Sequence, residues 1–222
     1  MVEVAGKFCV DAYEASLVEV RGADRVPWSP YHSPLSTSTY RAVSARGQVP
    51  QGYISGVQAQ AACRNAGKRL CSKAEWLAAC QGQERRSFPY GAAHKPGACN
   101  EHSKDPKHVS PLQRLHKGNP TYDLKTMLDP RINQLPDTVL PGGSKPECVS
   151  PAGAYDMVGN LHEWIADKTD KGLGIFKGGY YNEADLNGPG CLYQTTRHDF
   201  AYADYSIGFR CCADAIGEPA FK

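Results

Sequence analysis

The sequence predicts an α+β fold: a single loop-rich domain with little regular secondary structure. The chain has 222 residues, which is enough for one large domain with a substantial core. It contains 22 Gly and 16 Pro, more than an average share, and this indicates many turns and loops. Its periodic segments are short and no repeat or linker separates them, so residues 1–222 are expected to form one domain.

The first half of the chain contains one expected strand and one expected long loop. Residues 5–14 alternate weakly between apolar and polar side chains, which is typical of a strand. Residues 22–53 are rich in Pro, Ser and Tyr and have no sustained period. We therefore expect residues 22–53 to form a long loop.

Two helices are expected next, and each begins with a capping box. Ser55 is followed three residues later by Gln58, and Ser72 is followed by Glu75. In this motif the two side chains bond each other's backbone N–H groups at the start of a helix. The second helix is expected to end at Gly82.

The second half begins with an irregular segment and ends in short strands. Residues 83–150 lack periodicity but contain many apolar side chains, so disulfides or bound cations are expected to organise them. Residues 153–168 are expected to form a compact loop followed by a strand. Three further short strands are expected in residues 174–180, 191–197 and 207–213.

The chain contains nine cysteines, and their spacing excludes the common zinc motifs. There is no CxxC pair, and no Cys/His spacing matches a zinc finger. Disulfides formed in an oxidising compartment are favoured, and the odd count leaves one thiol free or paired with another chain. We expect a secreted, periplasmic or cell-surface protein. Because the first residues contain no positively charged and apolar leader, a signal peptide is expected to have been removed.

Composition excludes several other classes of protein. The net charge is +2 and the pI is near 8.0, which is too balanced for a nucleic-acid or membrane-surface binder. No apolar run is long enough to span a membrane. The sequence also lacks the nucleophile elbow GxSxG, the phosphate loop GxxxxGK[ST], a dinucleotide-binding GxGxxG turn after a strand and the zinc motif HExxH.

The segment DMVGNLHEW, residues 156–164, has the composition of a calcium loop. Asp156, Asn160 and Glu163 supply hard oxygen donors, and Gly159 permits a tight turn. The spacing is not that of an EF-hand. The alternative interpretation is an ordinary polar turn before a strand.

The segment TRHDFAYADY, residues 196–205, is the best candidate for a binding or active surface. It brings together Arg197, His198, Asp199 and Tyr202, whose side chains hydrogen-bond or titrate. A structural turn is the alternative. The polar stretch that contains His102, His108 and His116 could supply a redox-metal site, but scattered surface histidines explain it more simply.

Several stretches together resemble the formylglycine-generating enzyme family, also called the sulfatase-modifying factor family. The stretches that carry the resemblance occur in family order over almost the whole chain: FCVDAYEAS (8–16), AQAACRNAGKRLCSKAEWLAACQG (59–82), SFPYG (87–91), ACN (98–100), SPAGAYDMVGNLHEWIAD (150–167), FKGGYY (176–181) and IGFRCCAD (207–214). The resemblance implies the fold of that family, a loop-rich variant of the C-type lectin fold.

The resemblance also implies particular disulfides. The family pattern pairs Cys63 with Cys211 and Cys80 with Cys191. Among the remaining cysteines, Cys99 with Cys148 would hold the irregular middle segment together. Cys212 could pair with Cys9 or with Cys71, and the sequence leaves this choice open.

Calcium binding is a further implication of the resemblance. The calcium loop of the family matches the Asp156 and Glu163 side chains and the Gly159 and Leu161 carbonyls. Asn100 and the Glu101 carbonyl match the first half of a second family site, whose later Asp has no counterpart that we can place. Calcium is therefore an expected cofactor.

The chain departs from the family at the catalytic centre. The family uses two cysteines, five residues apart, which bind Cu(I) and activate oxygen against a substrate cysteine. The corresponding residues 180–190 here are YYNEADLNGPG and contain no cysteine. Counting back from Cys191 places Leu186 and Tyr181 at the two positions. Counting forward from the KGG motif places Glu183 and Gly188 there. We therefore do not expect this chain to generate formylglycine.

Two hypotheses follow. The first is a binding module for a protein, peptide or glycan ligand, with a surface formed by Tyr181, Glu183, Arg197, His198, Asp199 and Tyr202. The alternative is an oxygen-dependent iron or copper oxidase with altered ligands such as His198 and Glu183. The HxxxHxE helix of the iron-dependent relatives is missing, since no two histidines are four residues apart.

Overall fold

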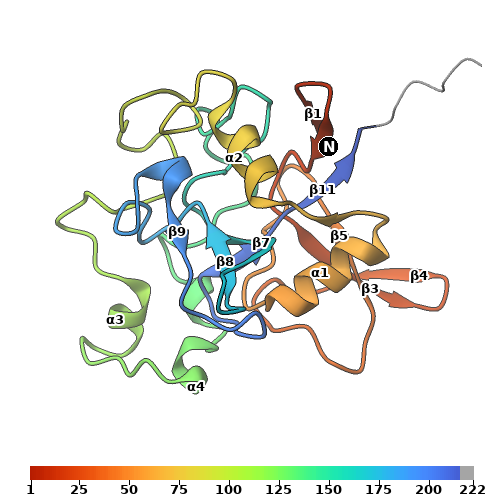
Figure 1. The fold of residues 1–222 in the computed structure, drawn as a ribbon. Helices are drawn as coiled ribbons and strands as arrows, with labels where there is room; N and C mark the ends of the chain where they lie inside the picture. The colour runs from red at the N-terminus through yellow and green to blue at the C-terminus, as the bar shows by residue number, and fades with distance from the viewer. Residues whose placement is uncertain (216–222) are drawn as a thin grey trace, which may run out of the picture.

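Three small sheets and two main helices surround the core in the computed structural model, which describes residues 1–215 (Figure 1). The first sheet has the strand order β1-β2-β11-β6, the second β10-β7-β8-β9 and the third β4-β3-β5. The strands are β1 Val2–Val4, β2 Phe8–Val10, β3 Ser16–Arg21, β4 Asp24–Pro27, β5 Tyr40–Val43, β6 Arg69–Leu70, β7 His162–Lys168, β8 Gly174–Lys177, β9 Gln194–Thr195, β10 Ile207–Phe209 and β11 Cys211–Asp214. The α+β, loop-rich fold class is confirmed.

Both predicted capping boxes are present. Helix α1, Gly56–Asn65, begins after Ser55, and helix α2, Lys73–Gln81, begins after Ser72. In each box the serine hydroxyl accepts the N–H three residues on, and the Gln or Glu side chain accepts the serine N–H. Gly82 ends α2 with a φ of 63°, a conformation that few other residues tolerate.

The expected long loop over residues 22–53 is wrong in part. Strands β4 and β5 lie within it and pair with β3 on either side. β4 forms a hairpin with β3 through a turn at residues 22–23, whereas β5 pairs with β3 across 21–27 positions, and local periodicity reveals neither pairing. Pro27 ends β4 at the edge of its sheet, where a proline costs no ladder hydrogen bond.

Short helices and one disulfide organise the irregular segment 83–150. Its helices are α3 Pro111–Leu115, α4 Leu124–Met127 and the 3₁₀ turn Ile132–Gln134. Leu112 and Ile132 pack with Tyr53, Tyr181 and Tyr205 in a small cluster of their own. Helices α3 and α4 lie on the far side of the molecule from the β3–β4 hairpin (Figure 1).

Four disulfides tie distant parts of the chain together. The three predicted bridges, Cys63–Cys211, Cys80–Cys191 and Cys99–Cys148, are confirmed. The pairing that the sequence left open is Cys71–Cys212. Cys9 is the free cysteine and is half-buried in β2. Cys211 and Cys212 are adjacent in β11. The first therefore connects this strand to the end of α1, and the second connects it to the residue that follows β6.

Two tryptophans anchor the core between the sheets. Trp76 and Trp164 are both completely buried. The Trp164 ring packs edge-on against Phe176 and Phe200, and its indole N–H donates to the Ile54 carbonyl at 3.0 Å. None of the helices in residues 1–215 combines the length and apolar character needed to cross a bilayer.

Candidate functional site

The predicted calcium loop folds into a tight turn at the start of β7. Asp156, Gly159 and Asn160 all have φ values between 55° and 74°, so the backbone reverses within a few residues. A Cβ atom on Gly159 would lie 2.2 Å from the Asn100 carbonyl oxygen, and only glycine avoids this clash. That carbonyl accepts the Asn160 N–H at 2.8 Å. The two segments predicted to bind calcium are thus side by side.

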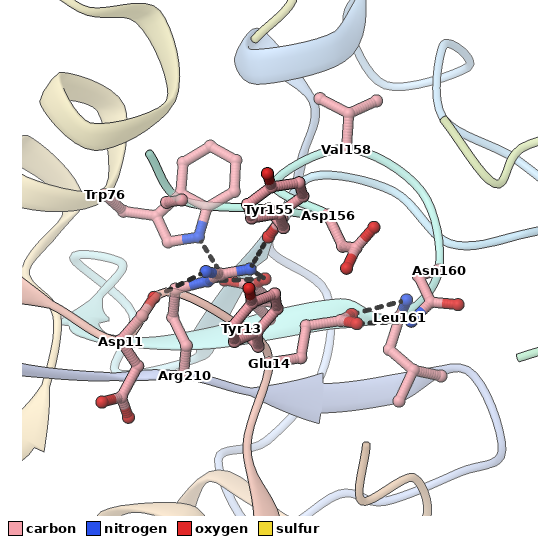
Figure 2. A network of polar contacts seen from close by, with 12 residues as sticks. Asp11, Tyr13, Glu14, Trp76, Tyr155, Asp156, Val158, Asn160, Leu161 and Arg210 are labelled. Atoms are coloured by element: carbon pink, nitrogen blue, oxygen red, sulfur yellow. Dashed lines mark hydrogen bonds and ion pairs between the residues drawn. The ribbon is translucent and has the colours of Figure 1, made fainter. Parts of the chain in front are cut away.

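A buried arginine occupies the centre of this region (Figure 2). Arg210 joins β10 to β11 and is fully buried. Its guanidinium donates to the carboxylate of Glu163 at 2.6–2.9 Å and to the Asp11 and Tyr155 carbonyls at 2.9 and 2.7 Å. The Trp76 indole N–H adds a bond of 2.6 Å to Glu163. Sequence reasoning did not assign Arg210 a role, although it lies in the GFRC motif.

Two further buried carboxyl groups lie close to this ion pair. Glu14 accepts the Leu161 N–H at 3.0 Å and a hydrogen bond from the Asn160 amide. Burial, together with the charges of Asp156 and Glu163, raises the pKa of Glu14 well above its usual value. Burial also raises the pKa of Asp156 to about 6. The region therefore holds three carboxyl groups against one guanidinium.

The two carboxylates predicted to bind calcium are engaged by protein donors in this structure. Both oxygens of Glu163 are engaged by Arg210 and Trp76, and Asp156 accepts the Gly143 N–H at 2.7 Å. Across residues 1–215, no three His, Cys, Asp or Glu side chains are arranged to hold a metal ion. Calcium stays a prediction from the resemblance.

Replacing Asp156 with Asn is expected to raise the free energy of unfolding at pH 7. The pKa of about 6 exceeds the value of about 3.9 in an unfolded chain. Between these two values the folded state keeps a proton that the unfolded state has lost, so the free energy of unfolding falls as the pH rises. Asparagine keeps the acceptor for Gly143 and tolerates the positive φ of this residue.

Urea denaturation at several values between about pH 4 and pH 7 measures this effect. We expect a gain on the order of 1–3 kcal/mol at pH 7 that shrinks toward pH 4. Exposed Asp170→Asn is the matched control and is expected to leave the profile unchanged. A loss of stability at pH 7 would contradict the prediction. A calcium-dependent gain in stability that Asp156→Asn abolishes would instead establish the predicted calcium site.

The predicted binding surface is assembled in part. Arg197 and Asp199 are exposed, and Glu183, His198 and Tyr202 are half-buried. The His198 ring stacks on the Tyr202 ring with centroids 4.2 Å apart. Tyr202 in turn donates to the buried carboxylate of Asp204 at 2.8 Å.

Tyr181 does not belong to this surface, and its assignment there is wrong. Its side chain is fully buried, and its hydroxyl donates to Asn133 at 2.8 Å. The preceding residue Tyr180 is half-buried and packs beside His162. Of these two tyrosines, Tyr180 is therefore the partly exposed one.

His162 is a residue that sequence reasoning missed. Its ring packs against Phe176, Tyr180 and Tyr193, with centroids 4.8–5.3 Å away. Burial, with a smaller effect from His198, lowers the pKa of His162 to about 3, so the ring is neutral at physiological pH. Its Nδ1 atom is buried and has no hydrogen-bond partner. Its place within the MVGNLHEW motif was the available signal.

Two of the three histidines of the middle segment, His102 and His108, are stacked on each other, and within residues 1–215 they belong to no cluster of three side chains that could hold a metal. The rings of His102 and His108 lie 4.2 Å apart and nearly parallel, and His108 Nε2 contacts Asn182 Oδ1 at 2.9 Å. The alternative ligand set of His198 and Glu183 is not assembled either. The Glu183 carboxylate accepts the N–H groups of Asp185 and Leu186 at 2.7 and 2.6 Å.

Fold and site together define a disulfide-stabilised, C-type-lectin-like domain with an aromatic surface and no cysteine in residues 180–190. The family model for the sulfatase-modifying factor enzyme 1-like domain matches residues 7–215. The chain therefore belongs to the formylglycine-generating enzyme (sulfatase-modifying factor) family.

Individual relatives are distant. An inactive C-alpha-formylglycine-generating enzyme 2 from Bos taurus is 28% identical over 180 residues, which cover 78% of this chain and 52% of the relative. The chain thus spans about half the length of the curated relative it matches. CarF matches with a TM-score of 0.51 and 18% identity, over 76% of this chain and 68% of its own. The Major Tropism Determinant P3c variant matches with a TM-score of 0.52 and 15% sequence identity, over 95% of this chain and 51% of its own. These two structures show a shared fold.

Proposed function

We propose that this domain is an exported, noncatalytic binding module of its family. The observation that carries the proposal is the absence of a usable thiol. Residues 180–190 contain no cysteine, and eight of the nine cysteines are disulfide-bonded. The free one, Cys9, is in β2 of a different sheet from the strands beside the candidate surface. The bovine relative carries the word inactive in its name.

The candidate contact surface is built from Tyr180, Arg197, His198, Asp199 and Tyr202. Half-buried aromatic rings offer flat apolar faces whose positions are fixed by stacking on neighbouring rings. Arg197 is exposed and has no ion-pair or hydrogen-bond partner among residues 1–215, so its donors are free for a ligand. A peptide or a glycan with an acidic group fits this combination.

Export is proposed because of the disulfides. Four bridges in one domain are typical of an oxidising compartment and rare in a reducing cytosol. Calcium forms no part of this proposal, because the Asp156 and Glu163 carboxylates that would bind it accept hydrogen bonds from protein donors.

An assay for formylglycine tests the absence of catalysis. We expect no product, by mass spectrometry, when the protein is supplied with copper, oxygen and a synthetic peptide that carries a sulfatase cysteine. An active member of the family, assayed in parallel, controls for the conditions. Conversion of the peptide by this chain would overturn the proposal.

Arrays of glycans and peptides probed with the labelled domain test the binding surface. Arg197→Ala is expected to lower binding about tenfold, the loss typical of removing one important contact. Its melting temperature should stay unchanged because Arg197 is exposed and makes no ion pair within residues 1–215. Lys171→Ala, at an exposed residue of the β7–β8 turn, is the matched control. Equal binding by Arg197→Ala and the wild type would contradict this surface.

A further inference from the structure

A second candidate surface lies on the three-stranded sheet β4-β3-β5. A groove of about 580 Å³ runs over this sheet and the neighbouring segments around Trp28 and Val49. Its lining is mostly apolar and contains no charged side chain. The lining includes Val18, Pro27 and Val43 of the sheet, with Trp28, Tyr31 and Val49 beside it.

Strand register shows which side chains share the outer face. Val18 of the central strand lies opposite Pro27 on one side and opposite Arg41 on the other. Val20 lies opposite Arg25. Because side chains directly opposite each other point to the same face, the two arginines flank the valines on one face. Leu17, one residue along, is only 2% exposed and faces the core, which identifies the valine face as the outer one.

The charge of this face is uncompensated. Arg25 and Arg41 are exposed, and neither makes a salt bridge within residues 1–215. Arg25 bonds only the carbonyls of its own hairpin turn. The acidic residues of these strands, Glu19 and Asp24, fall on the opposite face by register. The outer face is therefore apolar in its centre and positive at its edges.

We propose that this outer face binds an extended acidic segment of another polypeptide, whose apolar side chains fill the groove and whose carboxylates pair with Arg25 and Arg41. Only a partner that alternates apolar and acidic groups satisfies both features. A nucleic acid or a sulfated glycan would pair with the arginines but leave the valines and prolines exposed to solvent. A bilayer surface fits poorly, because the most exposed large apolar side chains of the described chain do not line this groove.

Selection from a displayed library of random peptides, each about 12 residues long and thus about 40 Å when extended, tests the proposal. The wild-type domain is the bait, and the variant Arg25→Glu/Arg41→Glu is used for counter-selection. We expect enrichment of peptides that combine acidic and apolar residues. Synthetic copies of them should bind the double variant at least tenfold more weakly than the wild type.

Two control variants and one further test variant make the result specific to this face. Lys125→Glu reverses an exposed charge on α4, at the far side of the molecule, and is expected to leave peptide affinity unchanged. Arg197→Ala should also leave it unchanged, which separates this proposal from the binding module proposed above. Val18→Ser should weaken binding while the melting temperature of the domain stays close to that of the wild type.

Other outcomes overturn the proposal. No enrichment, or enriched peptides that bind the double variant as well as the wild type, would show that this face does not recognise acidic segments. Heparin or vesicles of phosphatidylserine that bind through Arg25 and Arg41, when no selected peptide does, would assign the face to a different class of partner.

Discussion

Arg210→Met is expected to lower the free energy of unfolding by about 3–5 kcal/mol, because it removes one partner of a buried ion pair and leaves the other charged. Glu163 is 1% exposed and loses its bonds from the guanidinium. The Asp11 and Tyr155 carbonyls also lose a donor. Urea denaturation followed by tryptophan fluorescence measures the change, since Trp76 contacts the same carboxylate.

A double-mutant cycle with Glu163→Gln isolates the ion pair. The amide still accepts the Trp76 bond but carries no charge, so Arg210→Met should cost clearly less in that background. Arg210→Lys keeps the charge but cannot donate to several acceptors at the same time as the guanidinium does. Its cost in free energy of unfolding should therefore be smaller than that of Arg210→Met but not zero. Equal costs for Arg210→Met in both backgrounds would show that the ion pair does not hold this region together.

Removal of the Cys63–Cys211 bridge is expected to cost about 3 kcal/mol in the chain-entropy model, because the loop that it closes in the unfolded chain is short while the other bridges are intact. The two cysteines are 148 residues apart in sequence, but the neighbouring Cys71–Cys212 bridge already joins the same two parts of the chain. Both are fully buried, and Cys63→Ala/Cys211→Ala keeps the site apolar. Thermal and urea unfolding of the double variant, with the other bridges verified by mass mapping, measure the loss.

Cys9→Ala is the matched control for this experiment. It removes a cysteine that makes no bridge and is only half-buried, so the change in the free energy of unfolding should be below about 1 kcal/mol. If both variants lost the same stability, the Cys63–Cys211 bridge would contribute nothing through loop closure.

The parts of the fold that local chemistry determines could be predicted from the sequence. The capping serines Ser55 and Ser72 and the terminal Gly82 each act within one turn of helix, and they appear as expected. The pairing of β3 with β4 and β5 depends on residues up to about 27 positions apart, for example Ser16 and Val43, and carries no local period. Residues 22–53 were therefore expected to be loop.

The candidate site was harder to predict from the sequence than the fold, for a related reason. Sequence composition identifies which residues can hydrogen-bond, but burial decides which of them face solvent. Tyr180 and Tyr181 are adjacent and chemically identical, yet one is half-buried at the surface and the other is fully enclosed. Likewise, Arg210 and its partner Glu163 are 47 residues apart along the chain, so no local pattern reveals their ion pair.

The position of the cysteine pairs has a consequence for biosynthesis. Three of the four bridges need a cysteine from the last part of the chain: Cys191, Cys211 or Cys212. Proteins emerge from the ribosome N-terminus first, so Cys63, Cys71 and Cys80 are exposed to oxidants before their partners exist. Only Cys99–Cys148 can close early. Premature bridges among the early cysteines must therefore be reversed before native pairing is complete, and yields of recombinant protein should rise when a disulfide isomerase is coexpressed.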